Sequence, residues 1–323
     1  MATINNTKIK TDLRTRTKSE RNTRGKLHNI DEKIIPFLWF HGNAEEAMNF
    51  YISIFKNSKV LNITRYGEVG PGQKGTVMAA IFILEGESFY ALNGGSEYAF
   101  TPSNSFYVSC KSVFEIKKIW ERLTDGGLVM MELDKYPFSE RYGWVQDKFG
   151  VSWQLILSNN TNKIIPFLTF SGKYQGMAEE AINLYISLFK NSGIQSIMRY
   201  NEGDVGQTGK IVHAEFKLHG QKFMAMDSAI EMQFTFSSAI SYFVNCKTQR
   251  EIDKFWKKLS DGGKIMQCGW LKDKFGVTWQ IVPTILGEMM HDPDPEKAER
   301  VTKAMMQMEK LDIKGLKQAY NLH

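Results

Sequence analysis

The spacing of hydrophobic residues along the chain changes repeatedly between strand and helix patterns. Residues 34–40, IIPFLWF, form an apolar run that is typical of a buried strand. After the candidate helix cap Asn43, apolar side chains share one helical face at Ala47, Phe50, Tyr51, Ile54 and Phe55. Strand-like runs follow at 59–66, 76–84 and 87–93. The pattern therefore predicts a strand, a helix and three more strands.

A second unit with the same order follows. It has a strand at 105–110 and an amphipathic helix at about 112–124, which ends at Gly126-Gly127. Its last three strands are predicted at 127–131, 142–147 and 151–157. We call each unit of one strand, one helix and three strands a module.

The pair of modules is then repeated. The segment AEEAMNFYISIFKNS (44–58) returns as AEEAINLYISLFKNS (178–192), with 12 of 15 positions identical. Likewise, DKFGVSWQ (147–154) returns as DKFGVTWQ (273–280), with 7 of 8 identical. A repeat of about 125 residues has the length of a whole domain, so the chain is a tandem duplication.

The duplicated domains are expected at 33–160 and 163–285, and they leave two terminal segments. Residues 1–30 carry the whole net charge of +6, and we expect residues 1–32 to form a disordered basic leader that has no nucleic-acid partner. Residues 286–323 should be helical from the cap Asp294 onward, with a methionine-rich stripe. We expect this stripe to pack on the parent domain, and a homodimer contact is the alternative.

Composition indicates an ordinary globular protein. Of the 323 residues, 42% are hydrophobic and 24% are charged, and no uncharged apolar run is long enough to cross a membrane. The first 30 residues lack the apolar core of a secretory signal. Three cysteines do not form a disulfide framework, so we expect a cytoplasmic protein without a membrane partner.

The repeated modules, the AEEAxxFY helix start and the closing DKFGVSWQ hairpin resemble the vicinal-oxygen-chelate (glyoxalase/bleomycin-resistance/dioxygenase) superfamily. The match is closest to its PhnB-like branch, often labelled 3-demethylubiquinone-9 3-methyltransferase-like. The resemblance implies an α+β fold of two tandem glyoxalase-like domains. Each would contain two βαβββ modules that form a cupped mixed sheet around a ligand cavity.

In metal-dependent relatives, the resemblance implies ligands on the first strand of each module and on the last strands. The matching positions hold Pro36 and Pro166, Ser105 and Ser241, and Gln154 and Gln280. Proline has no ligating side chain, a neutral hydroxyl is a poor ligand, and glutamine brings no charge. We therefore expect no metal and no cofactor.

The strand HAEFKL (213–218) carries the best candidates for catalysis. His213 and Glu215 alternate on one face, and an imidazole beside a carboxylate suits proton transfer. Repeat one has Ala79 and Ile81 at the matching positions. Gln280 is expected to join His213 and Glu215 within repeat two.

The remaining candidates would bind a ligand. Trp144 and Trp270 precede the repeated DKFGV block by three residues and are expected to provide aromatic walls. With them we group the polar residues Ser105, Gln154, Ser241 and Gln280.

The sequence leaves several functions open. We favour a protein that binds a small organic molecule in the sheet cavity. The first alternative is a metal-dependent lyase, isomerase or dioxygenase that uses Glu215, His213 and Gln280. The second is methyl transfer to a quinone-like substrate, as the branch label suggests, although the glycine-rich loop 67–75 is not followed by the helix that a nucleotide-type cofactor site needs.

Overall fold

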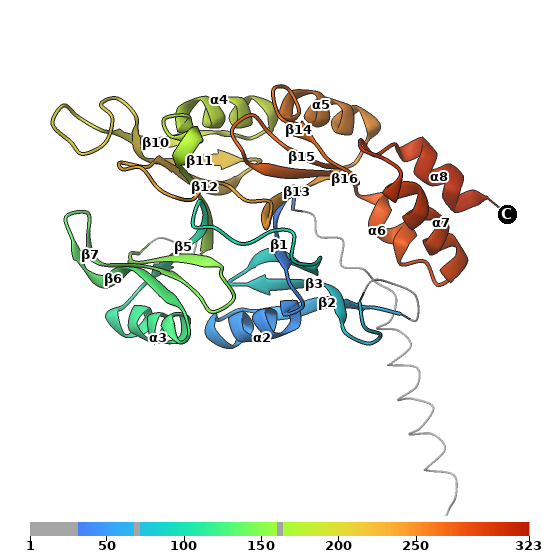
Figure 1. The fold of residues 1–323 in the computed structure, drawn as a ribbon, viewed down its shortest axis with the longest axis horizontal. Coiled ribbons are helices and arrows are strands. Elements are labelled where there is room, and N and C mark those ends of the chain that lie inside the picture. The colour runs from blue at the N-terminus through green and yellow to red at the C-terminus, as the bar shows by residue number, and fades with distance from the viewer. Residues whose placement is uncertain (1–31, 68–71, 160–163, 323) are drawn as a thin grey trace, which may run out of the picture. The chain divides into compact units, whose positions relative to one another are not determined.

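A computed structural model of the chain describes residues 32–67, 72–159 and 164–322. These residues form two eight-stranded mixed sheets, here called sheet A and sheet B, with helices on their outer sides (Figure 1). Apart from Glu32, the expected basic leader lies outside the described residues. Within those residues, no helix combines the length and the apolar character needed to cross a membrane.

Sheet A combines the first module of repeat one with the second module of repeat two. Its strands run in the order β14-β15-β16-β13-β1-β4-β3-β2. Repeat one supplies β1 (Ile34–Phe40), β2 (Lys59–Arg65), β3 (Val77–Leu84) and β4 (Glu87–Asn93). Repeat two supplies β13 (Ile240–Cys246), β14 (Lys264–Ile265), β15 (Trp270–Lys272) and β16 (Thr278–Pro283).

Sheet B combines the other two modules. Its strands run in the order β10-β11-β12-β9-β5-β8-β7-β6. Repeat one supplies β5 (Asn104–Cys110), β6 (Leu128–Tyr136), β7 (Ser139–Gln146) and β8 (Ser152–Leu157). Repeat two supplies β9 (Ile164–Phe170), β10 (Gly193–Arg199), β11 (Ile211–Leu218) and β12 (Gln221–Asp227).

Two antiparallel strand pairs join the repeats. In sheet A, β1 pairs with β13 and places Phe37 opposite Ser241. In sheet B, β9 pairs with β5 and places Phe167 opposite Ser105. The predicted α+β fold of glyoxalase-like domains with two βαβββ modules per sheet is confirmed. The two modules of one sheet, however, come from different repeats.

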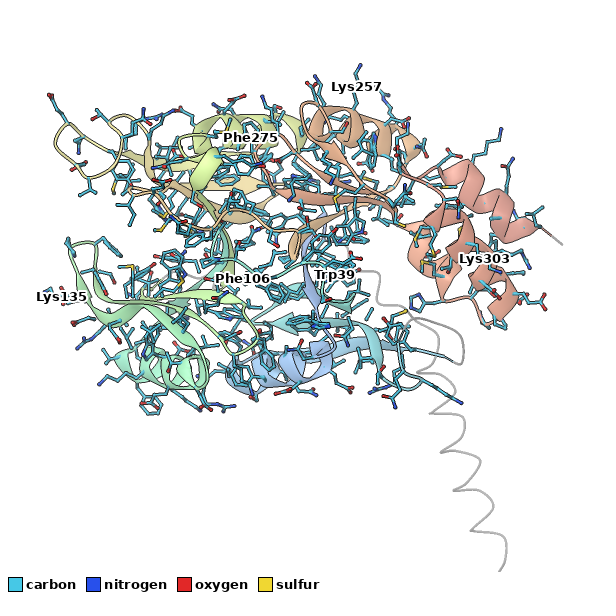
Figure 2. The ribbon with its side chains drawn as sticks, in the orientation of Figure 1. Trp39, Phe106, Lys135, Lys257, Phe275 and Lys303 are labelled. Carbon is cyan, nitrogen blue, oxygen red and sulfur yellow. The ribbon has the colours of Figure 1, made fainter. Side chains whose placement is uncertain are left out.

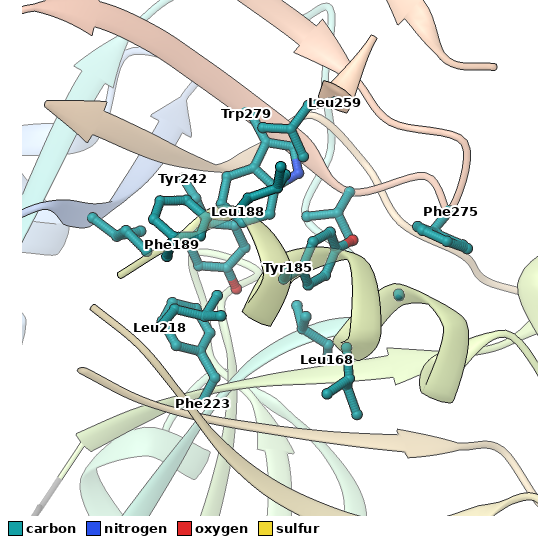
Figure 3. Packing of buried hydrophobic residues seen from close by; sticks show 14 of the residues in the cluster. Leu168, Tyr185, Leu188, Phe189, Leu218, Phe223, Tyr242, Leu259, Phe275 and Trp279 are labelled. Carbon is teal, nitrogen blue, oxygen red and sulfur yellow. The ribbon is translucent and has the colours of Figure 1, made fainter. Parts of the chain in front are cut away.

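The hydrophobic cores follow the repeats rather than the sheets. The helices α2 (Ala44–Ile54) and α3 (Val113–Thr124) cover the core of repeat one, and α4 (Ala178–Leu188) and α5 (Gln249–Leu259) cover that of repeat two. In repeat two, Tyr185 of α4 packs against Trp279 of β16 with ring centroids 5.1 Å apart (Figure 3). Each repeat therefore buries its own core, while its two modules enter different sheets.

The first helix of each repeat is capped from a neighbouring strand. Asn43 occupies the N-cap position of α2 as predicted, but its side chain makes no capping hydrogen bond. Instead, the Ala44 N–H donates to Oδ1 of Asn93 at 2.9 Å. The Ala178 N–H likewise donates to Oδ1 of Asp227 at 3.0 Å. In both repeats the capping residue follows the helix start by 49 residues, so the local sequence pattern does not predict either cap.

A buried aspartate ties the helices to the closing hairpins. Asp147, at the β7–β8 turn, accepts hydrogen bonds from the Tyr51 hydroxyl and the Trp153 indole N–H, both at 2.8 Å. It also accepts from the backbone N–H groups of Phe149 and Val151. Asp273 repeats this network in repeat two, with Tyr185, Trp279, Phe275 and Val277 as donors.

The C-terminal segment forms three helices, α6 (Ile285–Met290), α7 (Pro295–Met306) and α8 (Ile313–Asn321). Asp294 caps α7 as predicted. Side chains of these helices pack on Val282 and Phe243 of sheet A, and partly buried methionines complete the cluster at Met289, Met290, Met305 and Met308. The predicted packing of the methionine stripe on the parent chain is confirmed.

Separating the repeats should destabilise both. Fragments 32–159 and 164–322 would each expose the strands that pair between repeats, so neither should exist as a monomer that melts at the temperature of the full chain. We expect each fragment to self-associate, and an equimolar mixture to form a one-to-one complex. Calorimetry and sedimentation velocity test this. Two monomeric fragments with the stability of the full chain would contradict it.

Replacing the turn aspartate should cost stability. Asp147→Ala leaves a buried hydroxyl, an indole N–H and two backbone N–H groups without an acceptor. We expect a loss of about 3 kcal/mol in the free energy of unfolding, and a similar loss for Asp273→Ala. Lys257 projects into solvent from α5 (Figure 2), so Lys257→Gln serves as a control with little effect. Chemical denaturation of the three variants measures the difference.

Candidate functional site

Alternate residues of each strand face either the helices or the opposite side, which we call the inner face of the sheet. In β9, Leu168 and Phe170 join the core beneath the helices, whereas Ile165 and Phe167 belong to a separate cluster on the inner face. The inner face of sheet B is therefore lined by β9 and the strands on either side of it. Sheet A has an equivalent inner face around β1.

The predicted ligand-binding residues gather as two matching sets, one on each inner face. On sheet B, Trp144 pairs with Gln154 across β7 and β8, and the Gln154 amide donates to the Ser105 hydroxyl at 2.8 Å. On sheet A, Trp270 pairs with Gln280 across β15 and β16. The Gln280 amide donates to the Ser241 hydroxyl at 2.9 Å.

His213 and Glu215 lie on β11 and face the inner side of sheet B. The alternation of β11 places both away from Ala214 and Phe216, which belong to the helix-side core. The prediction that Gln280 joins them is wrong, because β16 belongs to sheet A. Gln154 of repeat one takes that place on sheet B.

Aromatic rings surround the imidazole. The ring centroids of Phe167 and His213 are 5.9 Å apart, and those of Tyr107 and His213 are 6.5 Å apart. Tyr107 and Phe167 stack at 6.0 Å with a 23° angle between ring planes. Sequence reasoning missed Tyr107 and Phe167. The signal for Tyr107 was its spacing of two residues from Ser105, which places both on one face of β5.

Burial and one carboxylate set the protonation of this site. Burial lowers the pKa of His213, and the negative charge of Glu215 partly opposes that shift. Burial also raises the pKa of the Tyr107 hydroxyl, and the charge of Glu215 raises it further. Near pH 7 the site thus presents a neutral imidazole and a neutral phenol.

The polar group of Gln154 is already engaged. The Tyr142 hydroxyl donates to its Oε1 at 2.8 Å, while its Nε2 donates to Ser105. Near this pair, the Trp144 indole N–H donates to the Ser152 hydroxyl at 2.7 Å. Trp144 is only 6% exposed, so its ring is packed against neighbouring residues.

The residues of sheet B do not fit the metal site of the superfamily. In the described segments, no three His, Cys, Asp or Glu side chains come close enough together to hold a metal ion. Pro166 pairs with Phe106, which belongs to the helix-side core. Pro166 therefore lies on the helix side of sheet B, whereas His213 lies on the inner face. The predicted alternative that joins Gln280 to His213 and Glu215 is excluded by the strand order.

The inner face of sheet A carries different chemistry. Where sheet B has His213 and Glu215, sheet A has Ala79 and Ile81 on β3. Aromatic rings dominate instead: Phe37 and Trp39 of β1, Tyr90 of β4 and Trp270 are half-buried. Burial first, and then the charge of Glu32, raises the pKa of Tyr90 to about 12.

Comparison with known proteins found one matching family model and several similar solved structures. The family model described as 3-demethylubiquinone-9 3-methyltransferase matches residues 32–156 and 162–282. The Bacillus cereus PhnB protein is 46% identical over 39% of this chain and all of its own length, with a TM-score of 0.39. A Staphylococcus aureus protein is 36% identical over 39% of this chain and 96% of its own, with a TM-score of 0.17.

A longer match shows the fold alone. Glyoxalase I from Zea mays aligns with 81% of this chain and 98% of its own length, at 13% identity and a TM-score of 0.52. No curated protein sequence matches the chain.

The imidazole of His213 should titrate below its ordinary value of 6.5. Because Glu215 raises this pKa, Glu215→Gln should lower it further, which an NMR titration measures. A lowered pKa favours the neutral ring in the folded state. The native protein should therefore lose stability relative to His213→Gln as the pH falls below about 6.5. An unchanged or higher pKa in Glu215→Gln would show that the two groups do not interact.

Proposed function

The chain belongs to the 3-demethylubiquinone-9 3-methyltransferase family, and we propose that it binds a small organic molecule on the inner face of sheet B. Family membership alone does not supply an activity, since function depends on the site rather than on the fold. The observation that carries the proposal is the placement of His213 and Glu215 beside the stacked rings of Tyr107 and Phe167.

The ligand class follows from these groups. Tyr107 and Phe167 offer ring surface to a planar molecule, and stacked or edge contacts between rings are favourable. The family description names a demethylubiquinone, which contains a planar ring. We take a planar phenol or hydroquinone as the ligand class, because its hydroxyl hydrogen would meet the neutral imidazole.

The chemistry that these residues support is proton transfer. A neutral His213 accepts the proton of the ligand hydroxyl, and the carboxylate of Glu215 stabilises the imidazolium that forms. The Tyr107 hydroxyl remains protonated and donates a hydrogen bond to the ligand oxygen. Burial strengthens each of these interactions because water is excluded.

The other activities receive less support. Methyl transfer needs a donor site, and the glycines of the β2–β3 connection stand between two antiparallel strands rather than before a helix. A metal-dependent reaction would need ligands that sheet B does not bring together. Both sheets are complete within one chain, so no second copy is needed to build either inner face.

Binding of 4-nitrophenol tests the proposal, because its phenolate absorbs at a longer wavelength than the phenol. At a pH where the free phenol is neutral, the wild-type chain should bind it and convert a fraction to phenolate. His213→Gln should abolish this ionisation and Glu215→Gln should reduce it. Neither change should shift the free energy of unfolding by more than about 0.5 kcal/mol at neutral pH, since both side chains are half-buried.

The duplicated glutamines provide a matched control. Gln154→Ala should weaken 4-nitrophenol binding about tenfold, because it frees the hydroxyl groups of Tyr142 and Ser105 within the site. Gln280→Ala removes the equivalent side chain from sheet A and should leave binding unchanged. Isothermal titration calorimetry measures both. A loss caused by Gln280→Ala instead, or an absence of ionisation in the wild type, would refute the assignment.

A further inference from the structure

The inner face of sheet A contains an aromatic corner. The ring of Trp270 stands nearly perpendicular to that of Phe37, with centroids 5.5 Å apart at 85°. It stands in the same way against Trp39, at 5.7 Å and 88°. All three rings are half-buried. Because they face the same side of the sheet, they form one aromatic surface on which a flat apolar group can pack.

Trp39 is held firmly in this corner. Its indole N–H donates to the carbonyl of Gly95 at 2.9 Å. The neighbouring Gly94 has no room for a side chain, because a Cβ there would lie 2.1 Å from the indole of Trp39. Trp39 lies inside the molecule in Figure 2, between the layers of the fold. The corner is thus preformed rather than assembled by a mobile ring.

Trp270 is positioned by the C-terminal segment. The N–H groups of Cys268 and Gly269 donate to the carbonyls of Met308 and Glu309 at 2.7 and 2.8 Å. These bonds hold the turn before β15, where Cys268 has a φ of +60°, a conformation that L-residues rarely adopt. The loop between α7 and α8 therefore fixes the strand that carries Trp270.

A pair of lysines adjoins the corner. Lys272 follows Trp270 by two residues on β15, so both face the inner side. Lys264 of β14 lies directly opposite Lys272 in the strand pairing. Like charges in this position destabilise a sheet. The matching pair in sheet B is Leu128 and Gln146, which are uncharged, so the lysine pair is particular to sheet A.

A third lysine comes from a different part of the chain. Lys173 lies in the short 3₁₀ helix η1 (Gly172–Tyr174) and acts on Lys272 by charge. Burial lowers the pKa of Lys272, Lys173 and Lys264 lower it further, and the charge of Asp273 opposes them. Asp273 itself is engaged beneath the helices by Tyr185 and Trp279.

The three lysines outnumber the one carboxylate, that of Asp273, whose charge acts on Lys272. None of the three lysines forms an ion pair with another described residue. An anion placed among them would relieve the repulsion between Lys264 and Lys272, and a charge-assisted hydrogen bond to the half-buried Lys272 would be stronger than one to a neutral donor. The lysine cluster adjoins the aromatic corner on β15, where Trp270 and Lys272 are successive residues on the inner face.

We propose that the inner face of sheet A is a second binding site, which takes an aromatic anion. Phe37, Trp39 and Trp270 hold the ring, and Lys272 binds the anionic group with Lys264 and Lys173 beside it. This site differs in chemistry from that of sheet B, where a neutral imidazole and a carboxylate meet a phenol. It stands independently of the function proposed for sheet B.

Calorimetric titration of the full chain with 2-naphthoate tests the proposal, and 2-naphthylmethanol provides the same ring without the charge. The wild type should bind the carboxylate at least about tenfold more tightly than the alcohol. Lys272→Gln should remove this preference by weakening naphthoate binding about tenfold. Trp270→Ala should weaken both ligands. Lys257→Gln on α5, and Gln154→Ala on sheet B, should change neither affinity.

Three results would overturn the site. The first is naphthoate binding that is equally tight in Lys272→Gln and the wild type, and the second is the absence of naphthoate binding in the wild type. The third is a loss of naphthoate binding in Gln154→Ala, which would place the ligand on sheet B. Circular dichroism of each variant separates lost binding from lost folding. Because the ionisation of 4-nitrophenol is compared between the wild type and His213→Gln, and naphthoate binding between the wild type and Lys272→Gln, failure of one proposal leaves the other intact.

Discussion

Everything else in this molecule depends on the two antiparallel pairings between the repeats, β1 with β13 and β9 with β5. Without them, each module would end in an unpaired strand, and backbone donors and acceptors along that edge would be open to any other chain. The pairings also decide which side chains meet, because each inner face is built half from repeat one and half from repeat two.

Each hydrophobic core joins the two modules of one repeat, whereas each sheet joins modules from different repeats. Together these contacts hold all four modules in one structure. Asp147 binds Tyr51 of α2, whose module belongs to sheet A, although Asp147 itself lies at a turn of sheet B. Asp273 and Tyr185 make the reciprocal link. A repeat therefore cannot lose its core without disturbing both sheets, and neither sheet is stabilised by one repeat alone.

Duplication supplied two equivalent inner faces, and substitution made them different. Both retain a tryptophan, a glutamine and a serine at matching positions. Sheet B adds ionisable groups on β11, at one end of the face. Sheet A has apolar residues there and instead places Lys272 opposite Lys264 at its other edge. The C-terminal helices pack on sheet A and bind Gln249 of α5, and the segment between them fixes the turn before Trp270.

The sequence by itself determined the modules, their duplication and the fold class, because periodicity and repeated segments are local properties of the chain. The hydrogen bonds that join Gln154 to Ser105 and Gln280 to Ser241 came from the tertiary structure. The sequence also identified His213 and Glu215, since alternation along one strand places them on one face. Only the tertiary structure decided that Gln154, and not Gln280, shares a sheet with them. The sequence likewise did not predict the cap from Asn93 or the effect of the Lys173 charge on Lys272. Strand pairing between distant segments leaves no periodic signal in the sequence, because either partner module offers the same hydrogen-bonding edge.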